Sequence, residues 1–270
     1  MRGMFTAGVT DVMMENGITF SGAIGVSAGA AFGCNYKSNQ PGRAIRYNVR
    51  FSKDPRYCSF RSLIKTGDMF GADFCYRRIP EELDLFDYDE FEKNPMEFYA
   101  VVTDVVTGEA VYKKLNSCRG NEMAWLRASA SMPLASKIVE VDGYKLLDGG
   151  IADSVPVKYF ESIGYEKSVV ILTQPEGYVK GENKLIPIMK LIMKKYPKLI
   201  DALKNRHKVY NDTLAYIKER EKEGALLVIR PEEKLPVKRV EHDPEVLKNV
   251  YELGRKEGEK RLSEVKKFIK

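Results

Sequence analysis

The hydrophobic pattern of the first residues changes from a helical period to a strand and back. Between residues 5 and 13 the apolar positions recur at three- and four-residue spacing, which predicts one face of an amphipathic helix that ends at Asn16-Gly17. The segment Ile18 to Val26 then predicts a strand, and the small residues Ala28 to Gly33 predict a second helix. The apolar positions of the first helix are Phe5, Val9, Val12 and Met13.

The same alternation continues to residue 173, except in one segment. Residues 43 to 95 carry mixed helical patterns with no clear strand, as expected of a lid or substrate-shaping insertion. Its aromatic residues suit either ordinary core packing, which we favour, or the wall of an acyl site. They are Tyr47, Phe51, Tyr57, Phe60, Phe70, Phe74 and Tyr76.

Strands and helices alternate again after this insertion, which is typical of an α/β layer fold. A hairpin is predicted over Lys137 to Leu147, with its turn at Asp142-Gly143. The other predicted elements are a strand pair (97–106 and 109–113), a helix (121–129), a short helix (155–163) and a buried strand (167–173).

Beyond Gln174 the pattern becomes mainly helical. Amphipathic helices are predicted near Leu185 to Met193 and over Pro197 to Lys222, then a strand at Ala225 to Ile229 and a final helix from Pro244 to Ile269. We therefore expect one large domain at residues 1–175 and a basic C-terminal extension, 176–270, packed on it.

The first chemical signal is the run Gly25-Val26-Ser27-Ala28-Gly29, a G-x-S-x-G pattern between the predicted strand and helix. At such an elbow the serine is pushed out of the sheet, and the helix N-terminus directs its N–H groups to the same point. Ser27 is therefore a candidate nucleophile. A plain strand-to-helix turn would give the same five residues.

The second signal is Asp148-Gly149-Gly150, directly after the predicted hairpin. An aspartate at a strand end, followed by two glycines, lies on a backbone that can approach another loop closely. Asp148 is thus a candidate base for the Ser27 proton.

At these residues the chain resembles the patatin-like phospholipase family. The matching motifs are Gly25 to Ala30, Arg127-Ala128-Ser129-Ala130-Ser131-Met132-Pro133 and Asp148-Gly149-Gly150, in that order, and the similarity covers about residues 1–175. The resemblance implies a three-layer α/β/α fold and a lipid acyl hydrolase that uses a serine and aspartate dyad without histidine, here Ser27 and Asp148.

The opening residues match only the end of the family's glycine-rich loop, at Arg2 and Gly3. The glycines that would bind the oxyanion, and the strand before them, would precede Arg2. The N–H of Ala28 remains as one oxyanion donor. We therefore expect low or absent esterase activity from the chain as printed, and restoration of activity when upstream coding sequence is added.

Only two histidines, His207 and His242, could complete a Ser-Asp-His triad. His207 falls on the inner face of an amphipathic helix, where a partly buried structural histidine is the favoured interpretation. His242 precedes Asp243-Pro244, a typical helix start, and is expected in a loop. Neither is a strong candidate, which agrees with the dyad that the resemblance implies.

The composition bears on the cellular compartment and on the need for a metal or cofactor. The four cysteines have no metal-ligand spacing, and no run of residues is apolar enough to span a bilayer, so we expect a cytoplasmic protein that needs no metal or cofactor. Cys34, close behind the elbow, is expected to be a buried small side chain and not a nucleophile. No sequence pattern indicates an oligomeric state.

Charge is concentrated in the C-terminal part. Residues 176–270 carry 24 Lys and Arg against 16 Asp and Glu, whereas residues 1–175 carry 20 against 22. A basic extension on a lipid hydrolase favours peripheral contact with an anionic membrane, although a solvated helical face has the same composition. No nucleic-acid motif is present.

The alternatives to a lipid acyl hydrolase are a non-catalytic lipid-binding or regulatory protein on the same scaffold, and a general esterase or thioesterase.

Overall fold

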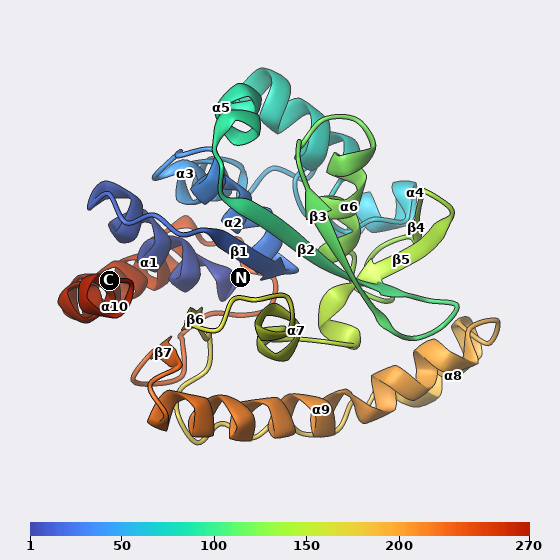
Figure 1. Cartoon of the computed structure of the whole chain (residues 1–270). Coiled ribbons are helices and arrows are strands. Elements are labelled where there is room, and N and C mark those ends of the chain that lie inside the picture. Colours follow the sequence, from blue (N-terminus) through green and yellow to red (C-terminus); the bar gives the residue numbers. More distant parts are fainter.

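The computed structural model describes all residues, 1–270, as a mixed α/β fold with long C-terminal helices (Figure 1). The strands are β1 (Gly22–Val26), β2 (Glu97–Asp104), β3 (Ala110–Leu115), β4 (Val139–Val141), β5 (Tyr144–Asp148), β6 (Ser168–Ile171) and β7 (Leu226–Ile229). The helices up to residue 129 are α1 (Gly3–Glu15), α2 (Ala28–Lys37), α3 (Arg43–Phe51), α4 (Phe60–Thr66), the π-helix η1 (Phe74–Leu83), α5 (Tyr88–Lys93) and α6 (Asn121–Ser129). Those after it are the short 3₁₀ helix η2 (Gly149–Ile151), α7 (Val157–Ser162), α8 (Ile186–Ile192), α9 (Pro197–Lys222) and α10 (Pro244–Phe268).

Strand β2 is the centre of the five-stranded main sheet. Along one edge it pairs antiparallel with β3, from Phe98–Leu115 to Thr103–Ala110. Along the other edge it pairs first with β1, in parallel, and then with β5, antiparallel. The last β1 pair joins Val26 to Val101, and the first β5 pair joins Asp148 to Val102. Two strands that run in opposite directions therefore meet end to end beside β2, and their C-terminal residues come together there.

Helices cover both faces of the main sheet and make a three-layer α/β/α arrangement. One face of β2, with Phe98, Ala100 and Val102, packs against α2, α5 and α6 in a fully apolar core. Figure 1 shows α7 and α9 on the other face. There Tyr99 contacts the aromatic rings of α7, and η2 packs against α8 and α9. The layered fold predicted from the alternation of elements is confirmed.

A second, two-stranded sheet joins the N-terminal and C-terminal parts of the chain. β6 pairs in parallel with β7, from Ser168–Leu226 to Ile171–Ile229. Both strands of this sheet contribute to cores shared with α9 and α10. The segment after residue 175 thus supplies a strand as well as helices.

Helices α1 and α10 pack at unusually close range. A Cβ atom on Gly8 would lie 2.1 Å from the carbonyl oxygen of Tyr251, and one on Gly254 would lie 2.0 Å from that of Phe5. The absence of side chains at these two positions lets the backbones touch. Around this contact the apolar residues of α1 are covered by Leu247, Val250 and neighbouring residues of α10.

Most predicted elements are present with small shifts of their ends. The Asp142-Gly143 turn has positive φ at both residues, 50° and 82°, as the short hairpin requires. The strand predicted from Ile18 begins only at Gly22, where pairing with β2 starts. Residues 43 to 95 contain helices joined by loops and no strand, as expected, with one isolated bridge between Cys58 and Phe70. None of the helices is at once long and apolar enough to cross a membrane.

Candidate active site

Ser27 occupies the sharp turn between β1 and α2. Its backbone has φ 55° and ψ −121°, a conformation that residues other than glycine rarely adopt. A Cβ atom on Gly25 would lie 2.5 Å from the carbonyl oxygen of Gly29, so only glycine fits where the strand passes the first turn of the helix. The strained turn exposes the Ser27 side chain at the end of the sheet, as a nucleophile elbow does.

Asp148 is the last residue of β5, and its backbone is fixed from both sides. Thr103 Oγ1 donates a hydrogen bond of 2.9 Å to the Asp148 carbonyl oxygen. A Cβ atom on the next residue, Gly149, would lie 2.2 Å from the carbonyl oxygen of Val101, so the chain can turn over β2 only with glycine there.

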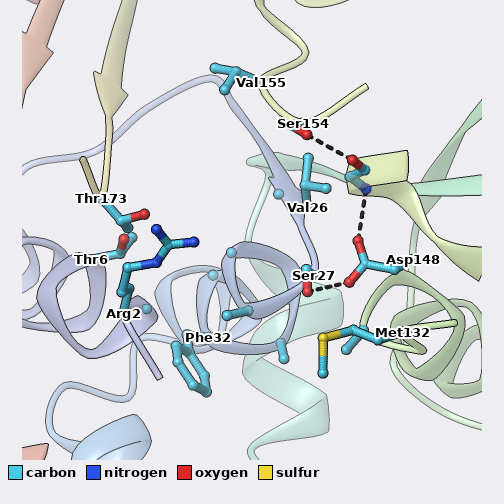
Figure 2. Close-up of a pocket in the computed structure, with 18 of the residues that line it drawn as sticks. Arg2, Thr6, Val26, Ser27, Phe32, Met132, Asp148, Ser154, Val155 and Thr173 are labelled. Atoms are coloured by element: carbon cyan, nitrogen blue, oxygen red, sulfur yellow. Dashed lines mark hydrogen bonds between the residues drawn. The ribbon is translucent and has the colours of Figure 1, made fainter. Parts of the chain in front are cut away.

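The two side chains meet at the junction of β1 and β5 (Figure 2). Ser27 Oγ donates a hydrogen bond of 2.6 Å to Asp148 Oδ2. The other carboxylate oxygen, Oδ1, accepts one of 2.8 Å from the Gly150 N–H. The second glycine of the Asp-Gly-Gly motif therefore orients the carboxylate, and Oδ2 is left to face the serine.

Burial makes Asp148 a stronger base than an exposed aspartate. Its side chain is buried, and this raises the pKa of the carboxyl above its ordinary value of 3.8, although hydrogen bonds from Ser27 and Gly150 and the charge of Arg206 act in the opposite direction. A raised pKa increases the affinity of the carboxylate for the serine proton.

The segment Arg127 to Pro133 holds the backbones of both residues. Ser129 Oγ accepts a hydrogen bond of 2.9 Å from the Ser27 N–H and donates one of 2.7 Å to the Val101 carbonyl. The Asp148 N–H donates 2.8 Å to the Ser131 carbonyl. The sequence marked this segment only through the family resemblance, and the role of Ser129 was not predicted.

The dyad opens into a cavity of about 1350 Å³ whose lining is mostly apolar. All residues of β1 and β6 line it, together with residues of α1, α2 and α9 and of the helical insertion. Aromatic residues of the helical insertion serve both as core and as cavity wall. Tyr47 and Tyr57 are buried in a local apolar core and also line the cavity.

The residues predicted to form an oxyanion site also gather here. α2 begins at Ala28, and its first hydrogen bonds run from Ala30 and Ala31 to the Ser27 carbonyl. The N–H groups of Ala28 and Gly29 therefore belong to the first helical turn, which has no intrahelical partners. A Cβ atom on Gly3 would lie 2.8 Å from Ala28 Cβ, so Gly3 packs directly beside this turn, and Arg2 precedes it at the cavity wall (Figure 2).

The two histidines and Cys34, the other possible catalytic residues of the sequence, make no contact with the dyad. His207 Nδ1 is 2.9 Å from the Lys204 carbonyl, and His242 Nδ1 is 2.8 Å from the Ser52 carbonyl; neither contacts Ser27 or Asp148. Burial raises the pKa of the Cys34 thiol to about 11, which makes it a poor nucleophile. Within the described chain no cluster of side chains has the composition of a metal site.

A layered α/β fold that presents a serine at a strained elbow, hydrogen-bonded to a buried aspartate, has the architecture of a serine-nucleophile hydrolase. Residues 1–161 match the model of the family described as patatin-like phospholipase, and the chain belongs to this family. Residues 196–270 match a second model, a domain of unknown function (DUF6363).

Two relatives illustrate the similarity. The uncharacterized protein YjjU of Escherichia coli is 29% identical over 189 residues, which is 64% of this chain and 49% of YjjU. The uncharacterized NTE family protein Mb1092c of Mycobacterium bovis is 24% identical over 170 residues, which is 63% of this chain and 45% of that protein. This chain thus spans about half the length of the curated relatives it matches.

Replacing Ser129 with alanine removes the two hydrogen bonds by which its hydroxyl joins the elbow to β2. We expect kcat to fall by about tenfold to a hundredfold, because the serine is displaced from its base, with a smaller effect on KM. We also expect a loss of about 1 to 3 kcal/mol in the free energy of unfolding, since the Val101 carbonyl is left buried without this donor. Steady-state kinetics and urea unfolding measure the two effects.

Ser131→Ala is the matched control, because the Ser131 hydroxyl bonds only to the Arg127 carbonyl one turn earlier. An equal fall in kcat for both variants would contradict the positioning role of Ser129.

Proposed function

We propose that this protein is a lipid acyl hydrolase that cleaves carboxylic esters through an acyl-serine intermediate on Ser27, with Asp148 as the base. The observation that carries the proposal is the 2.6 Å hydrogen bond from Ser27 Oγ to a buried carboxylate at a strained elbow. Membership of the patatin-like phospholipase family supports it.

In the first half-reaction Ser27 Oγ forms a bond to the ester carbonyl carbon while its proton passes to Asp148 Oδ2. The resulting oxyanion is placed toward the N–H groups of Ala28 and Gly29, at the N-terminus of α2. When the intermediate collapses, the ester C–O bond breaks and the leaving alcohol takes the proton from Asp148.

In the second half-reaction water takes the place of the alcohol. Asp148 removes a proton from water as its oxygen attacks the acyl carbon, and then returns that proton to Ser27 as the acyl group leaves. The Gly150 N–H holds Oδ1 throughout, so Oδ2 faces the reacting atoms in both steps.

An apolar lining favours an ester with a long acyl chain over a small polar one. The cavity beside Ser27 is large enough for an acyl chain, and rings from the helical insertion form part of its wall. We therefore propose phospholipids or related acyl lipids as substrates. A cytoplasmic location, expected from the cysteines and the hydropathy of the sequence, remains part of this proposal.

The proposal is tested by labelling with a fluorescent fluorophosphonate, which reacts only with an activated serine. Labelling needs an activated serine but not efficient ester turnover, so it applies even where the oxyanion site is incomplete. We expect the chain to be labelled, Ser27→Ala to abolish labelling, and Asp148→Asn to slow it by about a hundredfold or more, because the base is lost. Gel fluorescence and the mass of the labelled peptide measure the result. Release of fatty acid from phospholipid vesicles, short-chain esters and acyl thioesters then separates a lipid hydrolase from a general esterase or thioesterase.

Ser168→Ala is the control, because Ser168 lines the same cavity from β6 but its hydroxyl donates only to the Tyr165 carbonyl. A chain that reacts equally after Ser27→Ala, or that does not react at all, would instead favour a non-catalytic lipid-binding protein.

The raised pKa of Asp148 gives activity and stability opposite pH dependences. The base must be ionised, so kcat/KM should rise with pH with a midpoint above 3.8. The folded state binds this proton more tightly than the unfolded state does, so the contribution of Asp148 to stability is present at low pH and is lost as pH rises through its folded pKa. Asp148→Asn should therefore unfold at a higher temperature than the parent chain near neutral pH, with a difference that shrinks toward low pH. Calorimetry across this range checks the sign, and a variant less stable than the parent at neutral pH would rule out the explanation.

We also propose that α8 contacts an anionic membrane surface. Met189 and Met193 face the core, whereas Leu191 and Ile192 are 77% and 63% exposed. Exposed lysines surround them at positions 184, 190, 194 and 195. Apolar side chains flanked by cations fit an interface with anionic headgroups, at about 1 kcal/mol for each cation near the surface. Figure 1 shows α8 at the outer end of α9, where a flat surface can reach it.

Flotation with vesicles of phosphatidylcholine containing phosphatidylserine tests this contact. We expect the double variant Leu191→Asp and Ile192→Asp to lose most of the bound fraction, since it places charge where apolar contact is needed. Leu85→Asp is the control, because Leu85 is 65% exposed and precedes α5, outside α8. Unchanged flotation of the α8 variant would exclude this surface.

A further inference from the structure

Four cationic side chains line the active-site cavity without an acidic side chain in a salt bridge to them. They are Arg2, Lys180, Arg206 and Arg239, and none of them forms a salt bridge or a side-chain hydrogen bond with another protein group. The cavity as a whole is lined by eight Lys and Arg residues but by only two carboxylates, Asp148 and Glu182. The single charge of Asp148 cannot balance Arg206 and the three other cations, so the cluster carries a net positive charge.

Arg206 is the cation nearest to the dyad. It projects from α9, and a Cβ atom on Gly150 would lie 3.1 Å from Arg206 Nη2 and 3.0 Å from Asp148 Oδ1. The guanidinium therefore lies against the backbone that orients the catalytic carboxylate. Arg206 Nε is buried and has no hydrogen-bond partner. A buried guanidinium donor without an acceptor is costly unless a ligand supplies one.

Lys180 is held beside the same helix. Its backbone N–H and carbonyl both bond to the side chain of Asn211 on α9, at 2.8 and 3.1 Å. Its ammonium lies 4.1 Å from the centre of the Tyr210 ring. Burial and the charges of Arg206, Arg2 and Arg239 lower the pKa of Lys180 to about 8, as expected for cations that crowd one cavity.

Arg2 and Arg239 are the exposed members of the group. They lie close together, since the backbone nitrogen of Met1, directly before Arg2, is 3.0 and 2.7 Å from the carbonyl oxygens of Lys238 and Arg239. Figure 2 shows the Arg2 guanidinium on the wall of the cavity beside Thr6 and Thr173. The cluster thus runs from a partly buried arginine beside the dyad to exposed arginines, along which an entering anion can exchange water for guanidinium donors.

We propose that Arg206, Lys180, Arg239 and Arg2 form a binding subsite for a phosphate group, and that the preferred substrate carries a terminal phosphate close to the ester that Ser27 attacks. This inference rests on the proposed function for the ester, but not for the binding of phosphate. Arginine forks bind phosphate oxygens in pairs, and a lysine adds a point charge. Four cations favour a terminal phosphate with two charges over a headgroup that brings its own cation.

The cations come mainly from outside the part of the chain that matches the patatin-like family. Lys180, Arg206 and Arg239 all follow residue 161, and Arg206 and Arg239 lie within the segment that matches the domain of unknown function. The C-terminal segment would therefore select the headgroup, while the family core supplies the chemistry.

Kinetics with three lipids that share one oleoyl chain test the selectivity. We expect kcat/KM to decrease in the order lysophosphatidic acid, lysophosphatidylcholine, mono-oleoylglycerol, each presented in the same neutral detergent micelles. Arg206→Gln should lower the ratio of kcat/KM for lysophosphatidic acid to that for mono-oleoylglycerol by about tenfold or more, through KM. Lys208→Gln removes a charge from the exposed face of α9, outside the cavity, and should leave the ratio unchanged. An unchanged ratio in Arg206→Gln, or an equal fall in both variants, would overturn the subsite.

Binding to the Ser27→Ala chain separates this inference from the hydrolase proposal. Calorimetric titration should show that glycerol 3-phosphate binds and glycerol does not, and that adding Arg206→Gln weakens binding about tenfold or more while adding Lys208→Gln does not. Inorganic phosphate that binds more tightly than glycerol 3-phosphate would assign the subsite to free phosphate instead of a lipid headgroup. Binding without any ester hydrolysis by the parent chain would keep the subsite and refute the hydrolase; hydrolysis with no phosphate binding would do the reverse.

Discussion

The end-to-end meeting of β1 and β5 beside β2 is the constraint on which the candidate active site depends. Each strand is bound to β2 by its own ladder, and the two ladders stop at the adjacent residues Val101 and Val102. Ser27 and Asp148, 121 residues apart in the sequence, are thereby held within one hydrogen bond. Because backbone pairing sets the distance, the side chains themselves need little ordering to reach each other, and Ser129 reinforces the junction from the next layer.

Local chemistry explains how much of the fold the sequence predicts. The elbow glycines, the Asp142-Gly143 turn and the helical periods depend only on residues that are neighbours in the sequence, and the elements they predict are present. Pairing between distant strands does not depend on neighbouring residues alone, so the sequence pattern does not predict it. The pattern over Lys167 to Thr173 indicated a buried strand, yet nothing near it indicated that its partner is β7, more than fifty residues later. The late start of β1 has the same cause, since its limits follow the ladder with β2.

The candidate site was predictable where a residue type and a turn coincide, as at Ser27 and Asp148. Residues that act through position alone were missed. Ser129 is one of many serines until its hydroxyl is placed between the Ser27 N–H and the Val101 carbonyl. Arg206 left a weak signal: it lies three residues after Leu203 and four before Tyr210, so a cation falls on the face of α9 that the apolar stripe marks as inward. Its proximity to Gly150 required the tertiary structure.

The close packing of α1 against α10 has a consequence for biosynthesis. The first helix to leave the ribosome is covered by the last, so Met4, Phe5 and Val9 have no complete apolar environment until residues near Val250 have been made. At about 5 to 20 residues per second, translation leaves this surface uncovered for roughly ten seconds or more. A nascent chain in this state exposes an apolar helix surface that is prone to aggregation. We expect the yield of folded protein in cells to depend on chaperones that shield such surfaces until synthesis is finished.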